Sequence, residues 1–195
     1  MTNFATFASS LNTLNKGINA PAIIAAIIAG ALIPLFNTSK QDAKIAKFLT
    51  LVDALRTACE QHYFDTGDYA KEYGNELTNC PRPNRELSCD RGLSGWNGPY
   101  ISHPLTVDDF PSSDQMWLQD VLNNYDIDCD GDTELRGNGN DLICGDIPET
   151  IAKKINDIID GGKDVLDWKN RGKVRYSSVI KSLEIHLYGG VITEP

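Results

Sequence analysis

The residues best suited to chemistry are the carboxylates of one acidic stretch, which reads DIDCDGDTE from Asp126 to Glu134. Carboxylates at alternate positions with a glycine at the sixth suit a loop that wraps a hard cation. The side chains at the first, third and fifth positions converge, and the glycine permits a sharp turn. The stretch therefore predicts a structural Ca²⁺ site with Asp126, Asp128, Asp130 and Asp132 as ligands.

The stretch departs from an EF-hand, because its twelfth position is Gly137 rather than glutamate. The closing ligand must come from Asn138, Asn140, Asp141 or a backbone carbonyl, and we take Asn138 and Asp141 as candidates. Magnesium is disfavoured, since it rarely accepts a cage made only of protein carboxylates. Two other interpretations stay open, a solvated acidic turn and a catalytic role.

Other signals of enzymatic chemistry are missing from the sequence. The run from Gly92 to Gly95 is followed by Trp96, so it lacks the last glycine of a nucleophile elbow. There is no Walker loop and no dinucleotide fingerprint. The three histidines have no metal-ligand spacing. We therefore expect a protein that is not an enzyme.

The chain must also accommodate an uncharged apolar segment, GINAPAIIAAIIAGALIPLF, from Gly17 to Phe36. As a helix its densest part would be about 26 Å long, close to the roughly 30 Å hydrocarbon thickness of a bilayer. Lipid or other copies of the segment must therefore cover it. Three interpretations remain open: a cleaved secretory signal, a plain membrane anchor, or an anchor that later becomes the core of a polymer.

The residues after this segment favour the polymer. From Lys40 the apolar residues follow steps of three and four, which is the pattern of one helix face. They are Ile45, Phe48, Leu49, Val52, Leu55, Cys59 and Tyr63. Gly67 is expected to end this amphipathic helix as a left-handed cap.

The five cysteines include no C-x-x-C pair, so after an export-type N-terminus disulfides are the better interpretation. Local spacing favours Cys80–Cys89 and Cys129–Cys144, with Cys59 as a small buried hydrophobe. The rival is Cys59–Cys80. A Cys129–Cys144 bridge would clamp both arms of the acidic stretch.

The rest of the chain predicts an α+β head. We expect loops over 65–111, a short helix over 114–123 and a helix over 147–159 with Ile151, Ile155, Ile158 and Ile159 buried. Two strands follow, over 173–177 and 183–188. In the second, Leu183, Ile185 and Leu187 alternate with Glu184, His186 and Tyr188, which predicts one buried and one wet face.

Several stretches in order resemble type IV pilins and type II secretion pseudopilins. They are AIIAAIIAGALIPLF in the apolar segment, YFDTGDY at the helix end, WNGPY from Trp96, the stretch from Ile147 to Gly162, and GKVRY from Gly172. The resemblance implies a pilin-like α+β fold, in which a long N-terminal α-helix packs on a small antiparallel β-sheet head with loops. It also supports the calcium prediction, because the family includes calcium-bearing heads.

The implied organisation has four parts: a leader or extension over 1–17, an apolar helix over 18–37, its amphipathic half over 38–64, and a head over 65–195 with an Asp-rich loop over 126–146. Processing would fall between Gly17 and Ile18. The apolar side chains that would drive polymerisation are Ile23, Ile24, Ile27, Ile28, Leu32, Pro34 and Phe36.

These expectations predict a structural subunit of a pilus- or pseudopilus-type filament with a calcium-stabilised head. Its partners would be identical or homologous pilin subunits, with an anchor in the inner membrane before assembly and a final place at the cell surface or in the periplasm. The net charge of −9 argues against nucleic acid. The alternative is a monomeric, membrane-anchored, calcium-dependent binding or adhesion module.

Overall fold

The computed structural model describes residues 20–75, 80, 83–110, 113, 115–162 and 166–192; side chains are described for all of these except 20–39, Asn123 and Ile192. The chain divides into two compact units, Met1–Ala43 and Lys44–Pro195. Helix α2, Ala20–Thr66, contributes to both. Gly17 and Ile18, the predicted processing point, and the predicted polymerisation side chains lie outside what is described. Within the described part of the chain, no helix is both long enough and apolar enough to cross a bilayer.

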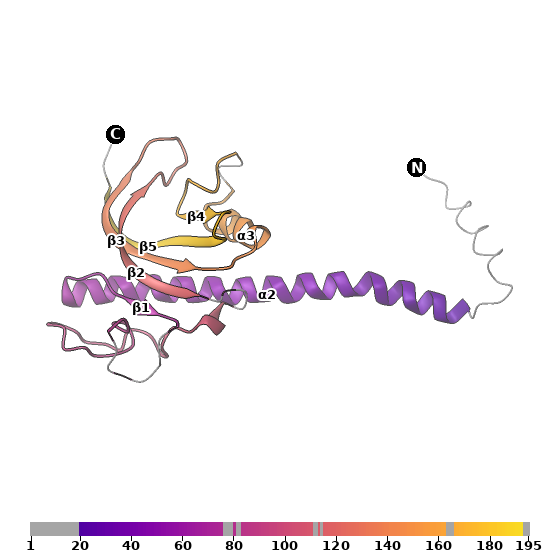
Figure 1. Ribbon diagram of the computed structural model, residues 1–195, viewed down its shortest axis with the longest axis horizontal. Coiled ribbons are helices and arrows are strands. Elements are labelled where there is room, and N and C mark those ends of the chain that lie inside the picture. Colours follow the sequence, from indigo (N-terminus) through magenta and orange to yellow (C-terminus); the bar gives the residue numbers. More distant parts are fainter. Residues whose placement is uncertain are drawn as a thin grey trace. The chain divides into compact units, whose positions relative to one another are not determined.

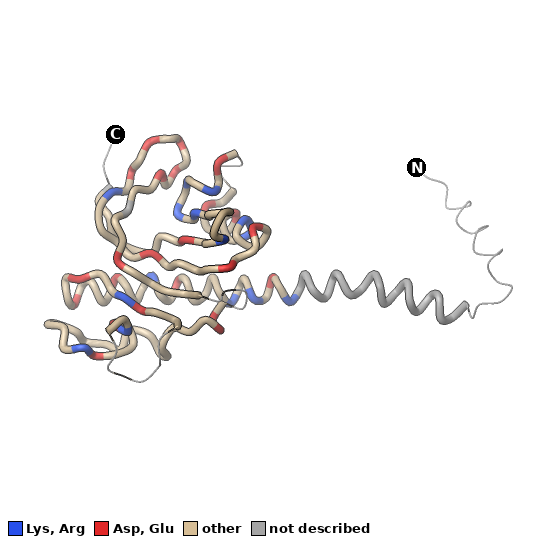
Figure 2. The backbone as a smooth tube through the Cα atoms, viewed as in Figure 1, with Lys and Arg blue, Asp and Glu red and all other residues tan. Residues whose placement is uncertain are grey.

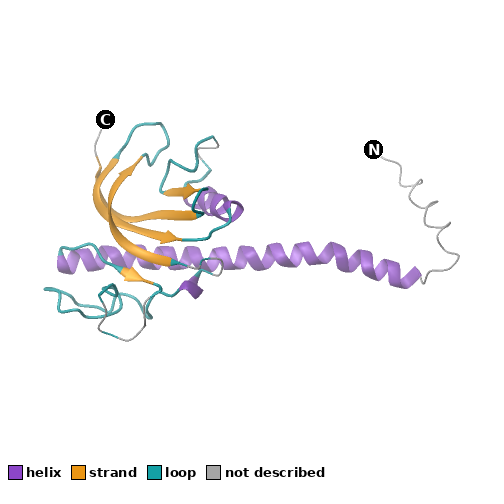
Figure 3. Cartoon of the chain, viewed as in Figure 1, coloured by secondary structure: helices purple, strands orange, loops and turns teal. Residues whose placement is uncertain are grey.

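The second unit is built on one five-stranded antiparallel sheet with the order β1-β2-β3-β5-β4 (Figures 1 and 3). The strands are β1 Glu72–Tyr73, β2 Met116–Tyr125, β3 Leu135–Cys144, β4 Val174–Ser177 and β5 Ser182–Ile192. A 3₁₀ turn, η1 Val107–Asp109, precedes β2, and helix α3, Glu149–Ile159, joins β3 to β4. The strands β2 and β3 curve strongly along their length (Figure 1).

The part of α2 within the second unit packs between the sheet and the loops over 83–110 (Figure 1). Most of its predicted apolar stripe is confirmed, because Ile45, Phe48, Val52, Leu55 and Cys59 are all buried, while Leu49 and Tyr63 are partly buried. They share one core with sheet residues, which include Leu118, Leu142 and Ile185. On the loop side, the rings of Phe48 and Phe110 lie 4.2 Å apart.

The predicted stop of this helix is also confirmed. The helix ends at Thr66, and Gly67 has φ of +79°. The Gly67 backbone N–H donates to the carbonyl of Tyr63 at 2.8 Å, which satisfies one of the last helical carbonyls.

The predicted fold class, a long N-terminal helix packed on a small sheet, is wrong. The sheet has five strands, and three of them contain ten or eleven residues. Within the second unit the helix on the sheet comprises only Lys44–Thr66, since the chain upstream belongs to the other unit. The sheet, rather than the helix, is therefore the main element of this unit.

Two further assignments need correction. The expected short helix over 114–123 is strand β2, in which Met116 and Leu118 point into the core at a spacing of two. The expected Asp-rich loop over 126–146 includes the whole of strand β3, so only Asp126–Glu134, hereafter the acidic loop, joins the two strands. Short apolar runs fit either a helix or a strand, and long-range pairing between β2 and β3 decides the matter here.

The later elements agree with the sequence more closely. Helix α3 lies within the predicted range and buries Ile151 and Ile155, but Ile158 is 59% exposed and Ile159 only partly buried. The strands predicted over 173–177 and 183–188 are β4 and the first part of β5.

One predicted disulfide is present and the other is not. Cys80 and Cys89 are bonded, with their Cα atoms 5.5 Å apart, so the rival pairing with Cys59 is wrong. No disulfide joins Cys129 to Cys144. Cys129 lies in the acidic loop, whereas Cys144 is buried at the far end of the ten-residue strand β3. A disulfide requires Cα atoms within about 7 Å. Cys59 is buried in the core as predicted.

An ion pair lies between the sheet and the loops with no exposure to solvent. Arg85 Nη1 is 3.0 Å from Glu72 Oε1, and both side chains are fully buried. The Glu72 carboxylate also accepts hydrogen bonds from the backbone N–H groups of Leu87, Ser88 and Leu105. Arg85 in turn donates to the carbonyl of Leu105. These bonds fasten the chain over 85–105 to strand β1.

Glu72→Gln should lower the free energy of unfolding by about 3–5 kcal/mol, because it leaves the Arg85 charge buried without its counter-ion. Urea denaturation of the full-length protein measures the change. The matched control is Asp53→Asn, which breaks the exposed pair between Asp53 and Arg56 and should cost less than about 1 kcal/mol. Equal effects of the two substitutions would contradict the importance given to the buried pair.

Candidate metal centre

Four carboxylates converge in the acidic loop at the tip of the β2–β3 hairpin. Ligand atoms from Asp126, Asp128, Asp130 and Glu134 all lie within 4.8 Å of one another. Figure 2 shows acidic residues concentrated at this tip. Such a group of oxygens suits a hard divalent cation, and Ca²⁺ in particular takes several carboxylate oxygens with flexible geometry.

Backbone N–H groups of the loop hold three of these carboxylates. Asp126 accepts from the N–H groups of Asp130 and Gly131, at 3.1 and 2.9 Å. Asp128 accepts from Asp130, and Asp130 accepts from Asp132. The turn depends on Gly131, whose φ of +110° is unfavourable for any residue with a Cβ.

The fourth carboxylate, Glu134, closes the loop from its other end. Its Oε2 atom accepts the N–H of Ile127 at 2.7 Å, and its own N–H donates to the carbonyl of Tyr125 at 3.1 Å. Glu134 is therefore positioned by the first residues of the loop, and it stands at the ninth position counted from Asp126.

Among the described residues, the cationic side chain of Arg171 borders the cluster. Arg171 Nε lies 3.5 Å from Asp126 Oδ2 and 3.6 Å from Asp167 Oδ2, and its Nη1 donates to the carbonyl of Cys129. Two like charges about 4 Å apart repel by about 1 kcal/mol in water and about 4 kcal/mol at an effective dielectric constant of 20. The Arg171 guanidinium offsets only part of the repulsion among four carboxylates, so a bound cation would stabilise the loop.

The predicted ligands divide into two groups. The structure brings Asp126, Asp128 and Asp130 together as expected, and it adds Glu134, which sequence reasoning did not choose. Asp132 is exposed outside the cluster, and its contribution is the backbone N–H that donates to Asp130. The position of Glu134, ninth in the loop, could have identified it as a candidate ligand, because calcium loops use that position.

Neither Asn138 nor Asp141 belongs to the cluster, because both are part of strand β3. Asn138 is exposed and lines a separate cavity. Asp141 is fully buried and accepts a hydrogen bond from the Tyr125 hydroxyl at 2.7 Å, while its other oxygen lies 3.0 Å from His186 Nδ1. Both predictions failed because a strand was read as a loop.

Comparisons with models of protein families, with curated proteins and with solved structures found nothing similar to this chain. The resemblance to pilins and pseudopilins therefore stays a prediction from the sequence.

The surroundings of Asp141 correct a further expectation. Glu184 and His186 were predicted on the wet face of the last strand, but His186 is only 6% exposed. Tyr125 covers this face, with its ring centroid 5.1 Å from that of His186, and the Arg175 guanidinium lies 3.9 Å from the centre of the Tyr125 ring. The alternation along the strand was right, but the curved hairpin buries part of the polar side, since Glu184 and Tyr188 stay partly exposed.

Burial raises the pKa of Glu184 to about 7, with a further contribution from the neighbouring Asp141 and an opposing one from Arg175. Burial also raises the pKa of the Tyr125 hydroxyl, again with Asp141 adding to the effect. The buried network thus favours the protonated form of Glu184.

The stability of the folded protein should depend on pH because of Glu184. The unfolded chain loses this proton near pH 4.5 and the folded protein near pH 7, so the folded state binds more protons between these values. The free energy of unfolding contributed by Glu184 should therefore fall by about 1–3 kcal/mol as the pH rises through this window.

Chemical denaturation at several pH values, with wild type and Glu184→Gln compared, measures this contribution. The substitution should remove that part of the slope, whereas Glu60→Gln, at an exposed position on α2, should leave the slope unchanged. Identical slopes for wild type and Glu184→Gln would contradict the assignment.

Proposed function

We propose that this protein is a structural subunit of a filament outside the cytoplasm, which polymerises through its apolar N-terminal segment and carries a calcium-stabilised second unit. The observation that carries the proposal is the separation of charge along the chain. No charged residue occurs between Lys16 and Lys40, although the backbone from Ala20 onward is helical. An uncharged helical segment of this length needs an apolar environment, and neighbouring copies of the same segment would supply one.

The disulfide supports the compartment in this proposal. A bond such as Cys80–Cys89 persists in the periplasm or outside the cell and is rare in a reducing cytosol. The membrane before assembly and identical or homologous subunits afterwards are the partners that we propose for the apolar segment.

The acidic loop contributes stability to the proposed subunit. A Ca²⁺ ion held by Asp126, Asp128, Asp130 and Glu134 would neutralise the repulsion in the loop and fix the tip of the β2–β3 hairpin. A ligand that binds only the folded protein adds to its stability by mass action. The role that we propose for the ion is structural, and we assign no reaction to it.

Calcium should raise the melting temperature of the full-length protein. At a concentration about 100 times the Kd the gain is about 2.7 kcal/mol, which corresponds to roughly 5–10 °C for a unit of this size. Asp130→Asn and Glu134→Gln should abolish the difference between calcium-loaded and chelated samples, as followed by differential scanning calorimetry.

The matched control for calcium binding is Asp132→Asn, which removes a charge from the same loop but not from the cluster. This variant should keep most of the calcium-dependent shift. The proposed site fails if chelation of a fully loaded wild-type sample leaves the melting temperature unchanged, or if Asp132 matters more than Glu134.

Filament formation should depend on the uncharged segment. Ile28→Lys places a charge in that segment and should abolish the filaments that electron microscopy detects in material sheared from cells, because a charge cannot be buried among apolar neighbours without a large cost. Val179→Lys is the control, since Val179 is 93% exposed in the second unit, and it should leave filaments intact.

Monomeric particles from wild-type cells would contradict polymerisation. They would favour instead a membrane-anchored, calcium-dependent binding module. The calcium experiment is independent of this outcome, because the acidic loop lies in the second unit and its binding of calcium does not require polymerisation.

A further inference from the structure

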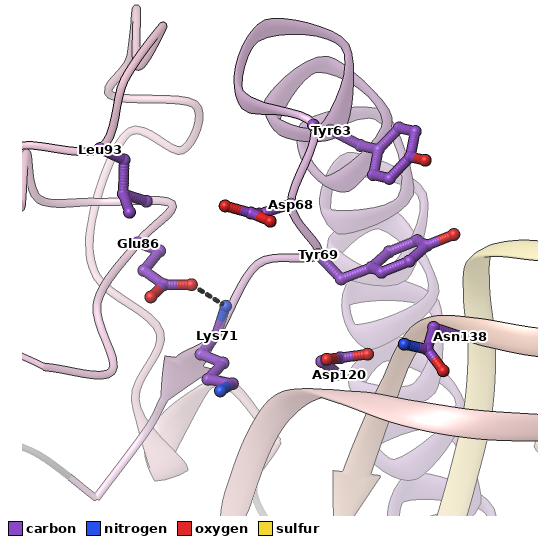
Figure 4. A pocket seen from close by; sticks show the side chains of 9 residues that line it. Tyr63, Asp68, Tyr69, Lys71, Glu86, Leu93, Asp120 and Asn138 are labelled. Atoms are coloured by element: carbon purple, nitrogen blue, oxygen red, sulfur yellow. Dashed lines mark hydrogen bonds between the residues drawn. The ribbon is translucent and has the colours of Figure 1, made fainter.

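A polar cavity of about 350 Å³ lies where α2 ends against the sheet (Figure 4). Cavities that bind small ligands begin at about 300 Å³. Its lining combines two tyrosines with carboxylate, amide and ammonium groups: Tyr63, Asp68, Tyr69, Lys71, Asp120 and Asn138. No part of the proposed function uses this cavity.

The cavity forms because one face of the sheet changes character along its length. Leu118 on β2 pairs with Leu142 on β3, and both side chains are buried in the core. On the same face, Asp120 lies two residues after Leu118 on β2, and Asn138 lies four residues before Leu142 on β3. Both Asp120 and Asn138 are exposed. Beyond the helix end this face therefore carries Asp120 and Asn138 beside the exposed Leu122, which pairs with Asn138.

The loop that forms the opposite wall is fixed to the sheet. The buried side chain of Asn140 donates to the carbonyl of Ala70 at 2.7 Å and holds the segment that follows α2 in place. The adjoining Tyr69 ring packs against Gly189, where a Cβ would lie only 2.6 Å from Tyr69 Cε1. The rings of Tyr63 and Tyr69 stack, with centroids 4.7 Å apart. The aromatic wall is thus preorganised before any ligand binds.

The charges of the cavity exclude some ligands. Glu86 is already engaged, because its carboxylate contacts Arg91 at 2.7 Å and accepts the backbone N–H of Lys71 at 2.9 Å. Asp68 and Asp120 then outnumber Lys71, so a phosphate, a sulfate or an acidic sugar would be repelled. An apolar ligand would leave the carboxylates and the amide without hydrogen bonds.

We propose that this cavity binds a neutral carbohydrate, a hexose unit at the end of a glycan. The aromatic side chains of Tyr63 and Tyr69 would contact the apolar C–H groups of the sugar ring. Figure 4 shows Tyr69 on the same side of the loop as Asp120 and Asn138. Asp120 accepts from sugar hydroxyls, Asn138 both donates and accepts, and Lys71 donates. This inference goes beyond the filament role and does not depend on it.

Saturation-transfer NMR and calorimetry with lactose, maltose and cellobiose test the proposal on the full-length protein in a detergent without a sugar headgroup. At least one disaccharide should bind saturably with a Kd of about 1 mM. Tyr69→Ala and Asp120→Asn should each weaken that binding about tenfold or more, as expected for central contacts.

Two matched variants control for unspecific effects. Tyr188→Ala removes a tyrosine that packs near Tyr63 but does not line the cavity, and Asp108→Asn removes an exposed carboxylate elsewhere. Both should bind as wild type does, and unchanged melting temperatures would establish that all four variants fold.

Three results would overturn the proposal. The first is that none of the three disaccharides binds saturably up to about 50 mM, a concentration well above the expected Kd. The second is that binding survives both Tyr69→Ala and Asp120→Asn. The third is that a tetralysine peptide binds more tightly than any sugar and is displaced by salt, which would make the cavity a site for cationic peptides.

Discussion

The second unit depends on a pair of opposite charges buried without water. Removing two ions from water costs several kcal/mol each, and their attraction repays this only when further hydrogen bonds satisfy them. Glu72 meets that condition, because it accepts bonds from Arg85, from three backbone N–H groups and from the Ser88 hydroxyl. The irregular chain over 85–105 consequently has one fixed position against β1.

This constraint also explains the layered arrangement. The loops have little regular structure, yet they cover the side of α2 that faces away from the sheet (Figure 1). The Tyr100 hydroxyl reaches Asp65 near the helix end at 3.0 Å, and Phe110 packs on Phe48. Leu87, Leu105 and Phe110 of the loop layer also belong to the apolar core, and the buried pair adds a polar anchor to these contacts. The polar cavity beside Tyr69 and the acidic loop occupy different parts of this unit.

Local patterns in the sequence predicted the local features of this fold. The apolar stripe of α2, the stop at Gly67, helix α3 and the last two strands all follow from spacing and capping residues. Strand β3 was not predictable in this way, because its sequence LRGNGNDLIC is rich in glycine and asparagine and becomes a strand by pairing with β2 and β5. Long-range pairing overrides such weak local preferences.

The same limit applies to the candidate site. The alternate carboxylates of the acidic loop identified three of its four candidate ligands, because loop spacing is local information. Asp141 and the expected Cys129–Cys144 bridge were assigned wrongly, since both assignments required β3 to be a loop. The ion pair of Glu72 and Arg85 could not be predicted from the sequence, because thirteen positions separate the two residues and only the fold brings them together.

Native-state hydrogen exchange of the backbone amides that donate to Glu72 tests the central role of this pair most directly. The amides of Leu87, Ser88 and Leu105 should exchange only through global unfolding, with the same free energy as the Leu142 amide in the middle of the sheet. Exchange of these three amides through a local opening of much lower free energy would contradict the account, since the loop layer would then move independently of the sheet.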